Sequence, residues 1–345
     1  MANVLDLRRR IRSVKNTRQI TKAMKMVSAA RLRRAQERAL ASRPMGQMLI
    51  NLLESLISRS ELVDHETGEC KHPLLEHRPE NNILLILVTG DRGLAGAFNS
   101  NVLKAAMKFL QVKADKNIDI LVVGRKGRDF LRRRYPTMKP DSPERAGKIQ
   151  VIDEYVTLLG KLEFESVGEM SAAVVKRYTR EQIDSVYLLF NEFKSVISQR
   201  VIVQRLLPVQ EIGRREVTAA EEPTQAERER MGEAARSAGI SLKEPGPTER
   251  DKEAAKFGTL PVDYIYEQPP EELFKAILPR YVAIEMFQAM LESAAAEHAA
   301  RMTAMDSATN NANDVIDSLT LNLNRVRQAA ITKEIIEIVS GAAAL

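Results

Sequence analysis

The two ends of this 345-residue chain both carry long helical patterns, and this constrains the fold more than any other feature. Within residues 1–58, large apolar side chains recur at helical spacing, at Leu7, Ile11, Val14, Ile20, Met24 and Val27. Only Pro44 and Gly46 interrupt the pattern, so we expect a kink there and then a continued helix. A helix of ~40 to 55 residues is on the order of 60 to 80 Å long.

The C-terminal segment, 268–345, carries the matching pattern. Its apolar side chains keep a strict three/four spacing and then restart one residue later, at Ile316, Leu319, Leu323, Val326 and Ala330, then Ile331, Ile335 and Ile338. Two helices with one apolar stripe each should pair. Because they stand at opposite ends of the chain, we expect an antiparallel coiled coil with the middle of the chain inserted at one end of the rod.

The middle of the chain, 80–207, has the pattern of an α/β domain. Apolar, β-branched runs alternate with helical patterns: the runs are 83–88, 120–123, 186–190 and 201–203, and the helical patterns are 95–112 and 164–178. This alternation predicts a Rossmann-like domain around a mostly parallel sheet. The fold class is therefore mixed, a long coiled coil with an α/β domain inserted between its two helices.

The next segment, 209–259, interrupts this alternation. It is rich in both acidic and basic residues, has few large apolar residues and is punctuated by Pro223, Pro245 and Pro247. Such a composition predicts a solvated insertion with two short helices.

Positive charge is concentrated at the N-terminal end. Residues 1–43 contain thirteen Lys and Arg but only two acidic residues, whereas the whole chain has a net charge of +6. This asymmetry predicts an acidic partner, either nucleic acid, an anionic membrane or acidic protein loops. A basic coiled-coil protein that binds nucleic acid is therefore one candidate, although this segment has no aromatic residue for stacking on bases and no known binding module.

Several classes of protein are excluded or disfavoured by composition. The longest apolar run, 83–88, is far shorter than the ~20 residues of a transmembrane helix. A single cysteine, Cys70, excludes a disulfide within the chain and suits a reducing compartment. The first residues have no apolar signal segment, so we interpret them as mature sequence.

Catalytic, cofactor and metal sites are hard to assemble from this sequence. The loop 89–96 follows the first predicted strand, but its glycines at 90, 93 and 96 do not match the spacing of a dinucleotide or P-loop motif. We interpret it as a tight turn, with an enzyme that binds a nucleotide there as a second alternative. Four possible metal ligands lie close together in the sequence, but they lack the usual ligand spacing: His65, Cys70, His72 and His77. We expect no catalytic residue, no metal and no cofactor.

The C-terminal helix contains an unusual polar cluster at 309–314, Thr-Asn-Asn-Ala-Asn-Asp. Asn and Asp disfavour helix interiors unless their side chains find partners. Together with Arg325, Arg327 and Gln328, this cluster predicts a rod surface that contacts other proteins.

Five segments, in order along the chain, resemble one family, the gamma subunits of F-type ATP synthases, in their bacterial form. They are ITKAMKMVSAAR (20–31), TGDRGLAGAFN (89–99), DYIYE (263–267), RMTAM (301–305) and ITKEIIEIVSGA (331–342). The resemblance implies a rotor shaft whose coiled coil sits inside a ring of three alpha and three beta subunits. It also implies a noncatalytic subunit that couples proton flow to ATP synthesis or hydrolysis.

The same resemblance implies further partners and a location. The base of the shaft would meet the epsilon subunit and the membrane c-ring, without nucleic acid and without a transmembrane segment of its own. The subunit would be a peripheral membrane protein on the cytoplasmic face of the bacterial plasma membrane.

Individual roles are carried over at matching positions. Met24 matches a position near the beta-subunit lever loop, and five further residues match the contact with the catalytic ring: Arg301, Arg327, Gln328, Thr332 and Glu334. Three residues match the foot that meets the c-ring and epsilon: Tyr264, Tyr266 and Glu267. Each of these side chains could instead only stabilise the coiled coil or the domain.

Two features depart from the family pattern. The connection from Leu207 to Pro261 is longer than in compact bacterial members. Plastid members carry an insertion with a pair of cysteines, whereas Cys70 is alone and lies elsewhere. We therefore expect a bacterial subunit without thiol control, and the role of the insertion stays open.

Overall fold

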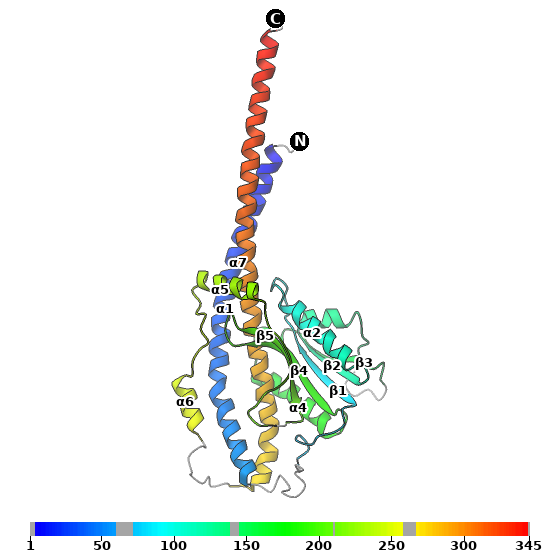
Figure 1. Cartoon of the computed structure of the whole chain (residues 1–345). Coiled ribbons are helices and arrows are strands. Elements are labelled where there is room, and N and C mark those ends of the chain that lie inside the picture. Colours follow the sequence, from blue (N-terminus) through cyan, green and yellow to red (C-terminus); the bar gives the residue numbers. More distant parts are fainter. Residues whose placement is uncertain (1–3, 60–71, 139–144, 210, 258–266, 344–345) are drawn as a thin grey trace.

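Two long helices form a rod that extends from a compact base (Figure 1). The computed structural model describes residues 4–59, 72–138, 145–209, 211–257 and 267–343. Helix α1 (Val4–Arg59) runs without a break through Pro44, and helix α7 (Pro270–Ala343) runs antiparallel to it. At 1.5 Å per residue, these helices of 56 and 74 residues are about 85 and 110 Å long. The expected coiled coil with an inserted α/β domain is confirmed.

The seam between α1 and α7, meaning the row of side chains that each turns toward the other, keeps a seven-residue repeat. On α1 the seam comprises Leu7, Ile11, Val14, Arg18, Thr21, Lys25, Ser28, Leu32 and Ala35. On α7 it comprises Met302, Met305, Thr309, Ala312, Ile316, Leu319, Leu323 and Val326. The spacing alternates between three and four residues throughout, as a left-handed coiled coil requires.

The expected apolar stripe on α1 is wrong beyond Val14. Ile20 and Val27 are 59% and 52% exposed, and Met24 is half-buried on the flank of the seam. The step of six residues from Val14 to Ile20 breaks the repeat, and polar residues continue it instead. The apolar residues of this stretch lie on the outer face of α1, and its buried face is polar, so a pattern based on apolar residues selected the wrong face.

The α/β domain is built on one six-stranded sheet, in the order β3-β2-β1-β4-β5-β6. Its elements are β1 (Asn82–Val88), α2 (Phe98–Val112), β2 (Asn117–Val123), α3 (Arg125–Leu131), β3 (Ile149–Tyr155), η1 (Leu158–Lys161), α4 (Phe164–Thr179), β4 (Ser185–Phe193), β5 (Gln199–Leu207) and β6 (Glu216–Glu221). Strands β1 to β4 pair in parallel, and β5 and β6 are antiparallel additions. The parallel part follows the Rossmann order.

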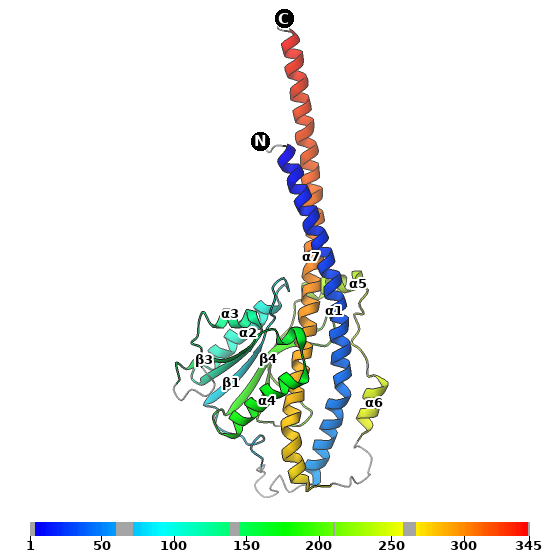
Figure 2. The same ribbon diagram turned by 180° about the vertical axis from the view of Figure 1, so that it is seen from behind.

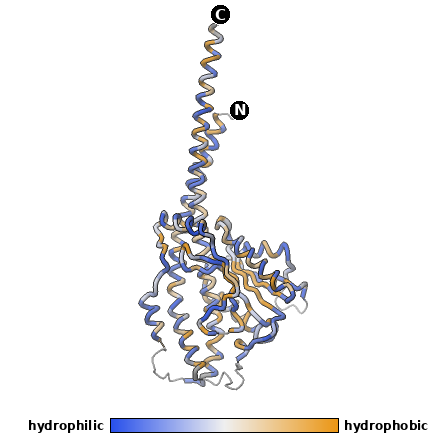
Figure 3. Tube along the Cα trace, in the orientation of Figure 1, coloured by the Kyte–Doolittle hydropathy of each residue, from blue (hydrophilic) through white to orange (hydrophobic). Residues whose placement is uncertain are grey.

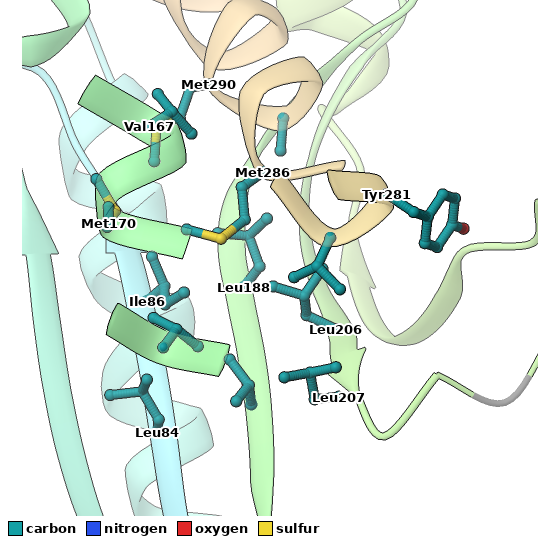
Figure 4. Packing of buried hydrophobic residues seen from close by; sticks show 14 of the residues in the cluster. Leu84, Ile86, Val167, Met170, Leu188, Leu206, Leu207, Tyr281, Met286 and Met290 are labelled. Carbon is teal, nitrogen blue, oxygen red and sulfur yellow. The ribbon is translucent and has the colours of Figure 1, made fainter. Parts of the chain in front are cut away.

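The rod helix α7 also forms part of the core of this domain. On β1, alternate residues face opposite sides of the sheet, with Ile83 toward α2 and Leu84 toward α4 and α7. Figure 4 shows Met170 of α4 and Met286 of α7 packed over the same sheet face as Leu84. Because both sheet faces are covered, the strands consist almost entirely of buried residues.

The segment 209–259 extends from the edge of the sheet to the far side of α1, where its helix α6 lies (Figure 2). It contributes strand β6, which the sequence did not indicate, and two helices, α5 (Gln225–Ser237) and α6 (Glu249–Lys256). Each helix starts with a capping box, in which the side chains of the N-cap threonine and the third helical residue bond to each other's backbone. The sequence TxxE or TxxD accounts for both starts.

Side chains of α1 hold this segment along the rod. Asn51 Nδ2 donates to the carbonyls of Ala254 and Phe257, at 3.2 and 2.6 Å. Arg33 donates to the carbonyls of Ala238 and Gly239, at 3.3 and 2.9 Å. The segment is therefore attached to α1 at both of its helices.

Hydropathy separates the base from the rod. Figure 3 shows the most hydrophobic stretches in the sheet, whereas hydrophilic and hydrophobic residues alternate along the rod. Among the described helices, none combines the length and the apolar character needed to cross a membrane.

Candidate functional site

The upper part of the rod contains polar layers within the seam. Arg18 donates from Nη1 to Oδ1 of Asn313 at 3.1 Å. Thr309 donates from Oγ1 to Oγ1 of Thr21 at 2.8 Å, and Thr309 also bonds to the backbone of its own helix. These bonds join α1 to α7 at fixed heights. A polar layer in a coiled coil fixes the register of the two helices at some cost in stability.

A third polar layer also holds the insertion. Lys25 is buried, and its Nζ donates to Oδ1 of Asp306 on α7 at 2.5 Å and to Oγ of Ser237 on α5 at 2.7 Å. The two charged side chains are only 11% and 14% exposed. One ammonium group therefore connects α1, α7 and the last turn of α5.

The polar cluster 309–314 serves two purposes. Thr309 and Asn313 bond to α1 within the seam, whereas Asn310, Asn311 and Asp314 are exposed. The prediction that this cluster contacts other proteins therefore applies only to its outer three members. The seven-residue repeat through Arg18, Thr21 and Lys25 is the signal that would have revealed the inner members.

Beyond Val326, helix α7 continues past the end of the described part of α1, and we call residues 327–340 the free end. Every residue in it is exposed. Five large apolar side chains are at least 49% exposed there, namely Ile331, Ile335, Ile336, Ile338 and Val339. The expectation that Ile331, Ile335 and Ile338 continue the paired stripe is therefore wrong, because the described part of α1 begins at Val4 and does not reach this far along α7. Exposed apolar side chains gathered on one segment typically mark an interaction surface.

The loop 89–97 packs against α7 at the top of the sheet. Arg301 Nη2 lies 2.5 Å from Oε1 of Glu297, and both residues are 7% exposed. The same guanidinium group reaches the carbonyl of Gly93 at 3.5 Å and Nδ1 of His298 at 3.5 Å. Burial, together with the positive charge of Arg301 and Arg31, lowers the pKa of His298 to about 4. His298 is therefore neutral near pH 7.

The predicted site residues do not converge on one site. Met24 is half-buried on α1, and Arg301 is buried against Glu297 rather than exposed on the rod. Four others are exposed on the free end: Arg327, Gln328, Thr332 and Glu334. Glu267 is exposed at the base, and Tyr264 and Tyr266 lie outside the described residues. Sequence reasoning missed Glu297, Lys25 and Asp306, whose roles depend on contacts across the chain.

Comparisons with known proteins agree on one family. A family model described as ATP synthase matches residues 3–345. The ATP synthase gamma chain of Solibacter usitatus is 44% identical over 344 residues, covering 100% of this chain and 99% of its own length. The chain belongs to the ATP synthase gamma chain family. The gamma chains of Trichlorobacter lovleyi and Geotalea uraniireducens are 41% and 40% identical, with 98% of each covered.

The lengths of these gamma chains show whether the insertion is peculiar to this sequence. Because the alignments cover 98% or more of both partners, such relatives are nearly as long as this gamma-family chain. The extra length of 209–259 is therefore shared with relatives and is not peculiar to this sequence.

A solved structure supports the fold of this gamma-family chain. It is the central stalk and c-ring of the mitochondrial ATP synthase of Tetrahymena thermophila, with a TM-score of 0.53 and 21% identity. The match covers 84% of this chain and 99% of the other. At this identity the likeness concerns the fold.

The layer at Lys25 gives a stability prediction. K25M leaves the Asp306 carboxylate mostly buried without its cation, so we expect a loss of about 3 kcal/mol in the free energy of unfolding. The double variant K25M/D306L should regain most of that loss, because no charge is left unpaired. Urea unfolding measures both, with K22M at the exposed Lys22 as control, expected within about 0.5 kcal/mol. Equal losses for K22M and K25M would contradict the assignment.

His298 gives a pH prediction. Its pKa of about 4 in the folded chain lies below the ordinary 6.5, so between these values the unfolded chain binds a proton that the folded chain does not. Stability should therefore fall as the pH drops from 6.5 toward 4, by up to about 1.4 kcal/mol per pH unit. H298Q should remove this contribution in unfolding curves measured across that range. H77Q, at the exposed His77, controls for loss of an imidazole.

Proposed function

We propose that this gamma-family chain is the central rotor shaft of an F-type ATP synthase and carries no catalytic residue of its own. The rod turns within a ring of three alpha and three beta subunits, and the base meets the epsilon subunit and the membrane c-ring. Rotation of the shaft couples proton flow to ATP synthesis or hydrolysis. The observation that carries this proposal is the free end of α7, a bare apolar helix on a rod fixed in a folded base.

The geometry of the rod suits this role. A single asymmetric rod presents a different face to each of three otherwise equivalent sites, so each orientation favours a different conformation at each site. Exposed apolar side chains on the free end supply nondirectional contacts that do not fix one orientation. The two-helix part below it supplies stiffness through a seam bonded at three heights.

The surface charge of α1 supports acidic partners for the rod. Ten of its cationic residues up to position 43 are exposed. Nine of these, all but Arg33, are Arg8, Arg9, Arg10, Arg12, Lys15, Lys22, Arg31, Arg34 and Arg38. Other cations on this stretch bond within the chain, as Lys25 and Arg33 do. The basic character that suggested nucleic acid is thus partly structural, and the remainder faces the subunits that surround the rod.

The proposed location follows from the proposed assembly. The base would attach to the c-ring at the cytoplasmic face of the bacterial plasma membrane, so the chain would be a peripheral membrane protein. Of the three residues proposed for the foot, the structure describes Glu267, which is exposed just before α7 begins at Pro270.

The decisive experiment is rotation in a reconstituted complex. Alpha and beta subunits from the same organism are combined with this chain, in a C70S background that carries V112C for attachment of a bead. Val112 is 71% exposed at the end of α2, away from the rod. ATP-driven stepwise rotation would support the proposal. A complex that assembles and hydrolyses ATP while the bead stays stationary would refute it.

The free end gives a binding prediction. The triple variant I335D/I336D/I338D places three carboxylates on the exposed apolar surface. Because each buried Ile contributes ~1.5 to 3 kcal/mol, binding to the alpha-beta ring should weaken by at least about 100-fold. Sedimentation of the reconstituted complex measures this, with V112D as a matched exposed control. Unfolding curves of the isolated variant should match those of the parent, because these side chains are exposed.

Met24 gives a coupling prediction. M24K adds a cation to the flank of the seam beside Lys25, where α1 already carries many cations. We expect a complex that assembles and hydrolyses ATP but pumps about fivefold fewer protons per ATP, equivalent to roughly 1 kcal/mol of coupling. Proton uptake by membrane vesicles gives the measurement, and M45K, at a 62% exposed position lower on α1, is the control. Normal pumping by M24K would remove Met24 from the coupling surface.

A further inference from the structure

The sheet of the α/β domain has a topological switch point between β1 and β4. The chain winds outward from β1 to β2 and β3, and then returns to place β4 on the other side of β1. In open α/β sheets, ligands bind in the crevice outside the carboxyl ends of the strands at this point. Here that crevice lies beyond Val88 of β1 and Phe193 of β4.

In this chain the crevice holds α7. A Cβ atom on Gly90, directly after β1, would lie 2.9 Å from Cδ of Glu297, so the carboxylate of Glu297 rests on the backbone of this glycine. A Cβ atom on Gly96 would likewise lie 3.6 Å from Cβ of Ala304. One buried apolar cluster joins the loop to both rod helices and to α5, and includes Phe98, Leu32, Ala234, Ala299 and Met302.

Two charged side chains complete this contact. Glu297 and Arg301, one turn apart on α7, form an ion pair at 2.5 Å with both side chains about 10% exposed. Arg301 also donates to the carbonyl of Gly93. Asn99 Oδ1 accepts from the backbone N–H of Gly90 at 2.9 Å, which fixes the loop from the other side. A buried pair adds less to stability than apolar residues would, but it requires one specific geometry.

We propose that Glu297 and Arg301 are positioning residues that fix the height and rotational angle of α7 relative to the α/β domain by holding the loop 89–96 against it. The crevice thus binds a segment of the same chain instead of a ligand. The consequence for rotation rests on the proposed rotor function, because the angle between base and rod decides which face of the free end meets each catalytic site.

The first test needs only the full-length chain. Backbone hydrogen exchange of residues 89–96 should be at least tenfold faster in R301M and in E297Q than in the parent. The double variant E297Q/R301M should be no faster than either single variant, because both residues act through one contact. K252M removes an exposed pair with Glu249 and is the matched control. Unchanged exchange in both single variants would overturn the proposal.

A cross-link tests the same contact by rescue. In a C70S background, G96C/A304C places two thiols where the Cβ atoms would be 3.6 Å apart, within the range of a disulfide. Cysteine at position 96 adopts a positive φ of 54°, so the oxidised protein is compared with its own reduced form. Oxidation should restore slow exchange to R301M, whereas continued fast exchange would contradict the assignment.

The final measurement separates this inference from the proposed function. In the reconstituted complex, the oxidised G96C/A304C chain should rotate like its reduced form, because α7 stays in the crevice through the whole cycle. R301M should broaden the distribution of bead angles at each dwell. Rotation that stops on oxidation would refute a permanent contact. Absence of rotation in the parent, with the exchange result intact, would refute only the rotor function.

Discussion

The packing of α7 against the sheet is the interaction on which the rest of this structure depends. The same helix buries Met286 in the core of the α/β domain, Met302 in the junction with the insertion and Ile316 in the seam with α1. A helix that serves three cores in succession cannot shift in one without disturbing the others, because protein interiors are close-packed. This continuity lets a slender rod be fixed firmly in its base.

The seam shows how specificity and stability are balanced along the rod. Apolar residues such as Leu7 and Ile11 stabilise the upper end, whereas Thr21 and Lys25 fix the register lower down. A wholly apolar seam would tolerate sliding by one heptad, because each layer would resemble the next. The polar layers remove this ambiguity. Lys25 also fixes the position of the insertion relative to the seam, through its bond to Ser237.

The free end and the crevice both suit a gamma-family chain. A gamma-family chain needs a rod that is rigid below and free to make nondirectional contacts above, and α7 changes from a paired to a bare helix at Val326. Lower on the same helix, Glu297 and Arg301 lie in the crevice of the Rossmann-like sheet. This explains why loop 89–96 has glycines at close approaches without the spacing of a nucleotide motif.

The sequence by itself determined the two long helices and the α/β middle, because periodicity and strand runs are local properties. It did not determine the seam of α1 beyond Val14, where polar residues occupy the buried face, nor strand β6, which is mostly exposed. Only the tertiary structure decided that the Glu297–Arg301 pair of α7 lies against Gly90 and Gly93 of the loop. Such contacts join residues that lie about 200 positions apart, and no local pattern records which distant segments meet.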